Sequence, residues 1–281
     1  MMASRSTLQL TSADESAEPI DSREAADSHR AAASVSKALH ILDCFSDVDH
    51  AMSLSELARR AELPKSTAFR LLAYLEEAGY VIRNAKMYRV GSKLFELGSR
   101  TNLCSTGGIR DIANPYLSDL HVRTGYVVHL AEMIGTDVMY LDKMQGHRSP
   151  TTPTRVGGRF NATCCALGKA MLANSDNLTV ADALRTGLPK RTAYSIGEPG
   201  RLIRELQLIR HNGVAFDREE AALGLVCVAA PIMFQGSAVA AISVSGATTQ
   251  FDPRAVAGLV QKSADRIAEQ YGLTQRQAAT A

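Results

Sequence analysis

The stretch from Ser53 to Gly91 constrains the fold most, because helix starts, helix stops and strand signals follow one another within forty residues. Ser53-Leu54-Ser55-Glu56 is a capping box: the Ser53 hydroxyl accepts from the Glu56 backbone N–H, and the Glu56 carboxylate reaches back. It predicts a short helix from Leu54 to about Ala61. Glu62-Leu63 forms a turn before Pro64, which is favoured as a first helical residue. The sequence therefore predicts two helices joined by a tight turn.

The second helix, from Pro64 to Ala78, has an apolar side and a polar side, and Gly79 ends it. The apolar side has the spacing of a buried stripe and consists of Ala68, Leu71, Leu72 and Leu75. The polar side consists of Lys65, Ser66, Thr67, Arg70 and Tyr74. This order is typical of a helix-turn-helix, whose second helix enters the major groove of DNA.

After Gly79 the pattern changes to two strand-like runs, 80–83 and 87–90, joined by a turn at Asn84-Ala85-Lys86. A basic hairpin directly behind a recognition helix is typical of a wing. Arg83, Lys86 and Arg89 would be available to backbone phosphates. A helical bundle capped by a hairpin with no role in DNA binding is the alternative.

The charge distribution agrees with a local nucleic-acid surface. The whole chain has a net charge of only +2, yet residues 59–93 hold eight basic and three acidic residues. Arg70 can donate two hydrogen bonds to a guanine edge, and Lys65, Ser66 and Thr67 can reach phosphates or base edges. On charge alone, an ordinary solvated face remains the alternative.

The first 33 residues are rich in Ser, Ala, Asp and Glu, and we expect them to form a disordered tail. From Ser34 a helical pattern begins, with Val35, Leu39, Leu42 and Phe45 on one face, a spacing that predicts a stripe buried against other helices. The tail lacks the apolar core of a signal peptide. The longest apolar stretch, Leu225 to Phe234, is too short to span a membrane and is predicted to be a buried strand.

The cysteines are odd in number and lack C-x-x-C spacing, which argues against a disulfide framework or a zinc site. They are Cys44, Cys104, Cys164, Cys165 and Cys227. We expect a cytoplasmic protein without a metal or other cofactor, and without a membrane partner.

The remainder predicts a linker helix within residues 92–107 and a larger domain over 108–273. Strands are expected at 126–134, 138–144, 224–234 and 237–245, and helices at 109–124, 166–173, 180–186, 201–211 and 253–271. This mixed order with hairpins predicts an α+β fold. We also expect a homodimer, because two DNA half-sites need two recognition helices. A linker with purely intrachain contacts is the alternative.

Several motifs in order resemble the IclR-type transcriptional regulators. In the N-terminal part they are Ser34-Val35-Ser36-Lys37-Ala38-Leu39, Leu54-Ser55-Glu56-Leu57-Ala58, Leu63-Pro64-Lys65-Ser66-Thr67, Arg70-Leu71-Leu72, Gly79-Tyr80-Val81 and Tyr88-Arg89-Val90-Gly91. Further along they are Ala166-Leu167-Gly168-Lys169-Ala170, Glu219-Glu220, 224–231 and Ser243-Val244-Ser245-Gly246. The resemblance covers about Ser34 to Tyr271.

The resemblance implies a winged helix-turn-helix domain over 34–91 and a GAF- or profilin-like effector-binding domain. It implies homodimers or tetramers, and a repressor or activator of catabolic genes that responds to a small organic-acid or aromatic effector. One departure concerns the pocket wall: the family often has proline where Asn161 stands, and His-Ala-Thr where Thr163-Cys164-Cys165 stand.

The candidate effector-binding residues follow from the same resemblance. They are Cys165, Ala166, Leu167, Asp217, Cys227, Ser243 and Ser245. A helix starting within Cys164 to Gly168 would favour a carboxylate through its free N–H groups. The residues alone favour other interpretations of these positions, namely small inward strand residues, a buried thiol and a turn carboxylate, and only the resemblance favours effector binding.

Two other functions stay open at this level. A redox-sensing regulator would oxidise Cys164 or Cys165 near a helix N-terminus, where thiol acidity is raised. A cysteine-dependent enzyme would use Cys165 or Cys227 as nucleophile, with Lys169, Glu219 or a histidine as base. No local sequence signature supports catalysis.

Overall fold

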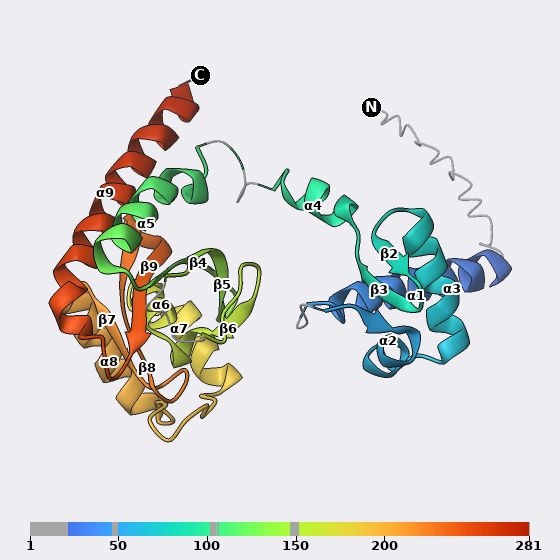
Figure 1. The fold of residues 1–281 in the computed structure, drawn as a ribbon, viewed down its shortest axis with the longest axis horizontal. Coiled ribbons are helices and arrows are strands. Elements are labelled where there is room, and N and C mark those ends of the chain that lie inside the picture. The colour runs from blue at the N-terminus through green and yellow to red at the C-terminus, as the bar shows by residue number, and fades with distance from the viewer. Residues whose placement is uncertain (1–21, 47–49, 102–104, 106, 147–151, 281) are drawn as a thin grey trace, which may run out of the picture. The chain divides into compact units, whose positions relative to one another are not determined.

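The computed structural model describes residues 22–46, 50–101, 105, 107–146 and 152–280, and its fold is drawn in Figure 1. The chain divides into two compact units, Met1–Lys93 and Leu94–Ala281. The α+β prediction is confirmed, because helices pack on antiparallel sheets in both units.

The N-terminal unit has the predicted element order. It contains α1 (Ser22–Asp43), β1 (Met52–Ser53), α2 (Leu54–Arg60), α3 (Lys65–Glu77), β2 (Val81–Asn84) and β3 (Met87–Val90). Its described strands form an antiparallel sheet in the order β1-β3-β2. The α3 residues Leu71, Leu72 and Leu75 are buried with Leu57 of α2, so the predicted apolar stripe is the core of this unit.

Local signals place α2 and α3 almost as predicted. Ser53 Oγ accepts from the Glu56 N–H at 3.2 Å, and α2 begins at Leu54. The second half of the capping box differs: the Glu56 carboxylate lies 3.4 Å from the Arg60 guanidinium, one turn along the same helix. Pro64 stands at the N-cap, one residue before the start of α3.

The predicted disordered tail is corrected in part. Residues 1–21 lie outside the described residues, but 22–33 belong to α1, which begins twelve residues before the expected start at Ser34. The physical reason is intrinsic propensity: this segment, SREAADSHRAAA, is rich in alanine, a strong helix former, and can extend the amphipathic helix that follows.

The predicted linker helix is shorter than expected. Helix α4 covers Ser92–Gly98, and the backbone then turns, with the Thr101 N–H donating to the Gly98 carbonyl. Glycine at the end of α4 favours this termination. The rest of the predicted linker lies only partly within the described residues.

The C-terminal unit is built on a sheet with the order β6-β5-β4-β9-β8-β7, in which every neighbouring pair is antiparallel. The strands are β4 (Val127–Ile134), β5 (Asp137–Met144), β6 (Arg159–Asn161), β7 (Ala215–Arg218), β8 (Leu225–Phe234) and β9 (Ser237–Ala247). The helices are α5 (Ile109–Thr124), α6 (Ala166–Leu172), α7 (Asn177–Thr186), α8 (Pro199–Asn212) and α9 (Pro253–Thr280). A 3-10 turn at Ala162–Cys164 precedes α6.

Helices cover both faces of this sheet, as Figure 1 shows. Helices α5 and α9 share one apolar cluster with Val228 and Ala230 of β8. Helices α6, α7 and α8 share the other cluster with Cys227 and Ala229 of the same strand. Because successive strand residues point to opposite faces, β8 is buried on both sides, in agreement with its uninterrupted apolar sequence.

In the described part of the chain, no helix has the length and apolar character needed to cross a membrane.

Candidate functional sites

The first candidate site is the solvent side of α3. Lys65, Ser66 and Arg70 are exposed and Thr67 is partly exposed, whereas the leucines behind them are buried. The 3.6-residue helical period produces this division, because four apolar positions face the core and the residues between them cannot. The predicted exposure is therefore confirmed, and contact of these residues with DNA stays a prediction.

The hairpin formed by β2 and β3 is the second part of this surface. Lys86 and Arg89 are exposed, and Lys86 lies in the tight turn, where Ala85 has a φ of 55°. Arg83 is exposed but partly engaged: its Nε donates to the Ala85 carbonyl at 3.0 Å, and its guanidinium lies 5.6 Å from the Tyr88 ring centroid. These contacts hold Arg83 near the hairpin tip.

Sequence reasoning missed one residue of the α3 surface. Phe69 is 48% exposed and lies between Ser66 and Arg70 on the helix. Phe69 belongs to neither the predicted apolar side nor the predicted polar side of the helix. Its spacing of three residues from Ser66 was the available signal, because residues three or four apart share a helix face.

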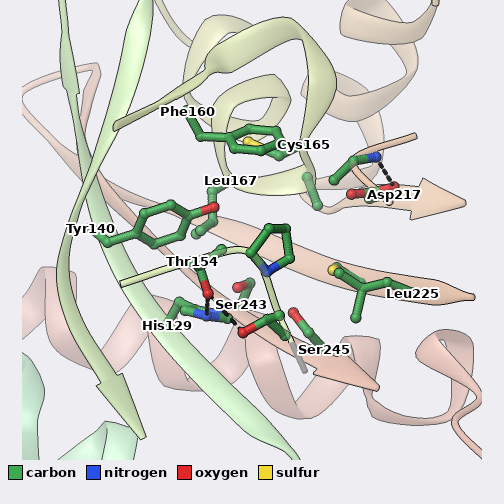
Figure 2. A pocket seen from close by; sticks show the side chains of 15 residues that line it. His129, Tyr140, Thr154, Phe160, Cys165, Leu167, Asp217, Leu225, Ser243 and Ser245 are labelled. Carbon is green, nitrogen blue, oxygen red and sulfur yellow. Dashed lines mark hydrogen bonds between the residues drawn. The ribbon is translucent and has the colours of Figure 1, made fainter. Parts of the chain in front are cut away.

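The third candidate site is a pocket inside the C-terminal unit, shown in Figure 2. All seven predicted effector residues line it: Cys165, Ala166, Leu167, Asp217, Cys227, Ser243 and Ser245. Its wall also contains residues that the sequence analysis did not select, namely His129, Tyr140, Thr152, Pro153, Thr154, Phe160, Ala221 and Leu225. No local pattern marked these eight positions. His129, Tyr140, Phe160 and Leu225 lie on strands that pairing brings together, and the other four lie on connecting segments.

Sheet register explains why four of the predicted residues meet. Asp217 of β7 pairs with Cys227 of β8, and Cys227 pairs with Ser245 of β9. Ser243, two residues before Ser245, points to the same face and pairs with His129 of β4. Side chains from two neighbouring cross-strand rows, on one face of four strands, therefore line the pocket together.

Asp217 is the most unusual polar group in the pocket. It is fully buried; Oδ1 accepts from the N–H groups of Glu220 at 2.7 Å and Ala221 at 3.4 Å. Within the described residues, Oδ2 has no hydrogen-bond partner. Burial, reinforced by the Glu220 charge, raises the pKa of Asp217 to about 7. Near neutral pH this carboxyl can therefore donate or accept a hydrogen bond, and Figure 2 shows it across the pocket from Tyr140.

A buried ion pair lies behind Asp217. Lys169 Nζ donates to Glu220 Oε1 at 2.6 Å and lies 3.7 Å from Glu205 Oε1, and the Lys169 side chain is fully buried. Lys169 belongs to α6 and Glu220 to the turn after β7, so the pair ties together two segments that line the pocket. The sequence contained both motifs but gave no indication that they pair.

The opposite end of the pocket is held by hydrogen bonds that converge on Thr154. His129 Nε2 lies 2.8 Å from Thr154 Oγ1, and burial lowers the pKa of His129 to about 3, so the ring is uncharged at neutral pH. The Thr154 hydroxyl also lies 2.9 Å from Thr152 Oγ1. The backbone carbonyl of Thr154 accepts a hydrogen bond from Lys143 Nζ at 2.7 Å. The space open to the centre of a water-sized sphere is about 20 Å³, enough for one water.

The buried thiols disfavour the redox and cysteine-enzyme hypotheses. Cys165 is the N-cap of α6, and its Sγ accepts from the Gly168 N–H at 3.4 Å. Burial nevertheless raises the pKa of Cys165 to about 12, and it raises the pKa of Cys164 and Cys227 as well. The expected rise in acidity at a helix start is outweighed by desolvation, so all three stay thiols, the poorly reactive form.

The departure at Asn161 has a structural role. Asn161 caps the 3-10 turn before α6, because its Oδ1 accepts from the N–H and the hydroxyl of Thr163. Cys164 is buried, and its thiol donates to the Pro189 carbonyl at 3.0 Å. The altered residues therefore stabilise the approach to α6, and of them only Cys165 lines the pocket.

Each of the two units matches a known protein family. Residues 34–85 match the family described as "IclR helix-turn-helix domain", and residues 101–269 match "Bacterial transcriptional regulator IclR C-terminal". The HTH-type transcriptional regulator XynR of Escherichia coli K12 is 31% identical over 78% of this chain and 88% of its own length.

Solved structures share the fold. The Thermotoga maritima IclR structure is 34% identical, with a TM-score of 0.70 over 85% of this chain and 98% of its own. An IclR homologue from Microbacterium hydrocarbonoxydans, crystallised with 4-hydroxybenzoate, is 23% identical, with a TM-score of 0.77 over 85% of this chain and 98% of its own. These relatives are regulators and not enzymes, and the chain belongs to the IclR family of DNA-binding bacterial transcriptional regulators.

Proposed function

We propose that this regulator binds operator DNA with α3 in the major groove, and that a small organic-acid or aromatic effector in the C-terminal pocket controls that binding. The observation that carries the effector part of the proposal is the pocket itself: all seven residues that the family resemblance selected line it, and one of them, Asp217, has a buried carboxyl oxygen without a partner among the described residues. Such an oxygen is costly unless a ligand or water satisfies it.

On the DNA side, the proposal rests on the exposed groups of α3 and the hairpin. Arg70 would donate to a guanine edge, while Lys65, Ser66 and Thr67 would contact phosphates or neighbouring bases. Arg83, Lys86 and Arg89 would contact the backbone and supply sequence-independent affinity.

The chemistry of the pocket supports a small ligand of low charge, and the pocket wall must open to admit it, because the space present holds about one water. Tyr140 and Phe160 supply aromatic surface, and Ser243 and Ser245 supply hydroxyls. Among the lining residues that the structure describes, none is Lys or Arg, so a carboxylate would be held by hydroxyls, backbone N–H groups and protonated Asp217. The ligand of the Microbacterium homologue, 4-hydroxybenzoate, is both an aromatic and an organic acid, which favours this class here.

Self-association is part of the proposal. Val35 and Leu39, one turn apart on α1, are 60% and 58% exposed, so the prediction that they are buried is wrong: only the later turns of α1 pack on the core of their unit. Phe95 of α4 is 79% exposed. Exposed apolar residues at helical spacing are suited to packing against a second copy. A dimer would present two copies of α3 to two half-sites. Light scattering on the full chain tests it, and a monomeric mass at micromolar concentration would contradict it.

The effector part is tested by a thermal-shift screen of the full-length protein with benzoate, 4-hydroxybenzoate and short 2-oxo acids. A ligand at about 100 times its Kd stabilises the native state by about 2.7 kcal/mol, which raises the Tm by several degrees. Ser243→Ala should abolish the shift, and Ser237→Ala, at the exposed start of the same strand, should keep it. Equal shifts in both variants would contradict the pocket assignment.

The DNA part is tested by enrichment of duplexes from a random library with the full-length protein. We expect an enriched sequence with two related half-sites, because a two-fold protein binds a palindromic site. A library without any enriched sequence would contradict the proposal.

A further inference from the structure

The core of the N-terminal unit does not explain why α3 carries a phenylalanine on its solvent side. Phe69 is 48% exposed, and it belongs neither to the buried cluster of this unit nor to the partly buried apolar residues packed against that cluster. The leucines of α3 already supply the apolar stripe. Removing the Phe69 ring should therefore cost the fold little.

The position of Phe69 on α3 places it among the candidate DNA contacts. It is in the N-terminal half of the helix, the half that helix-turn-helix proteins direct at base edges. It follows Ser66 by three residues and precedes Ala73 by four, so the three share one exposed face. Arg70, the candidate guanine contact, is its exposed neighbour.

A phenyl ring on this face can recognise only one feature of the major groove. Bases present hydrogen-bond donors and acceptors there, and thymine alone adds an apolar group, the C5 methyl. Contact between the ring and that methyl removes apolar surface from water on both sides. The thymine methyl group is thus a suitable contact for the Phe69 ring, whereas the polar side chains of α3 gain less from it.

We propose that Phe69 is a specificity-determining residue that contacts the C5 methyl of one thymine in each half-site, within about two base pairs of the guanine contacted by Arg70. This inference rests on the proposed function. The alternative partner for the exposed Phe69 ring is a second copy of the chain. The basic neighbours Lys65 and Arg70 favour DNA, because a copy of this face would bring like charges together.

The test uses full-length protein and the duplex enriched from the random library. Each thymine is replaced in turn by uracil, which removes the methyl and keeps the base pairing. Affinities of wild type, Phe69→Ala and Phe69→Leu are measured for each duplex. Tyr74→Ala is the matched control, since Tyr74 is an exposed aromatic on the same helix, 61% exposed and five residues further along.

We expect wild type to bind about 4- to 15-fold more weakly when one thymine per half-site becomes uracil, because each half-site loses one buried methyl group and the two losses multiply. Phe69→Ala should bind the thymine and uracil duplexes equally, and Phe69→Leu should keep part of the difference. Tyr74→Ala should keep the full difference. Unchanged thermal unfolding of Phe69→Ala shows that the loss is local.

Three results overturn the inference. The first is a Phe69→Ala protein that still discriminates thymine from uracil. The second is a wild-type protein that responds to no uracil substitution. The third is a Phe69→Ala protein whose only change is a lower oligomeric mass, which would assign the ring to a protein contact. These failures leave the proposed function standing, whereas a library with no enriched sequence overturns both.

Discussion

The two candidate sites differ in where their polar groups lie. The proposed DNA surface consists of exposed side chains on one helix and one hairpin, supported from behind by an apolar core. The pocket consists of buried polar groups, including Asp217, His129 and the Lys169–Glu220 pair behind it. Exposed groups keep their solvation, but buried ones depend on protein partners. Function and stability should therefore be separable on the DNA surface and coupled in the pocket.

The largest effect is expected from the buried ion pair. Lys169→Met leaves the Glu220 carboxylate buried without its partner, which should lower the free energy of unfolding by about 3–5 kcal/mol. Lys169→Met combined with Glu220→Gln should recover part of the loss. The control is Arg185→Met, whose ion pair with Asp182 is exposed and should cost less than about 1 kcal/mol. If urea denaturation shows the same loss of unfolding free energy for Lys169→Met and Arg185→Met, the contrast between buried and exposed polar groups is contradicted.

The next effect is the pH dependence of Asp217. Its pKa is raised by burial, so its stabilising contribution is complete at acid pH, below the pKa it has when unfolded, and is lost as pH rises through about 7. Between pH 5 and 8 the free energy of unfolding of wild type should fall by about 2–3 kcal/mol relative to that of Asp217→Asn, in which residue 217 does not titrate. Thermal unfolding of both proteins at both pH values measures this. If the difference in unfolding free energy between the two proteins is the same at pH 5 and pH 8, Asp217 is charged over that whole range and the raised pKa is wrong.

On the DNA surface, Arg70→Ala should separate function from stability. We expect a loss of about 1–3 kcal/mol in affinity for the enriched duplex, a smaller loss on random DNA, and an unchanged Tm. Arg70 is exposed, so its removal leaves no buried group without a partner. Equal losses on enriched and random DNA would argue against a base contact.

The smallest effect is expected at the hairpin tip. Lys86→Ala should weaken binding to enriched and random DNA alike, by less than about 1 kcal/mol, and reduce the slope of log K against log salt by about 1. Titrations at several salt concentrations measure the slope. A change restricted to the enriched sequence would move Lys86 from the phosphate contacts to the base contacts.

The same contrast decides what could be predicted from sequence. The α3 surface was predictable because Lys65, Ser66 and Arg70 lie within two turns of a single helix, where spacing determines the face. The hairpin of β8 and β9 was predictable from two long apolar runs. The edge strands β6 and β7 were missed, since three or four residues are too few to show a period.

The pocket was predictable only where the family resemblance pointed to it. Asp217, Cys227 and Ser245 meet through strand register, and His129 joins them from a strand that the sequence places about ninety residues before Asp217. The redox hypothesis loses support for the same reason: the acidity of Cys164 and Cys165 depends on burial in the tertiary structure, which the neighbouring residues do not reveal.

The central claim is that occupancy of the pocket controls DNA binding, and one titration tests it most directly. Full-length protein is titrated onto the enriched duplex with and without a saturating compound that raises the Tm, beside Ser243→Ala as the variant that should not respond. The account predicts that the compound changes the affinity of wild type by at least about 5-fold, in either direction, and leaves Ser243→Ala unchanged. The same affinity with and without the compound in wild type would contradict it.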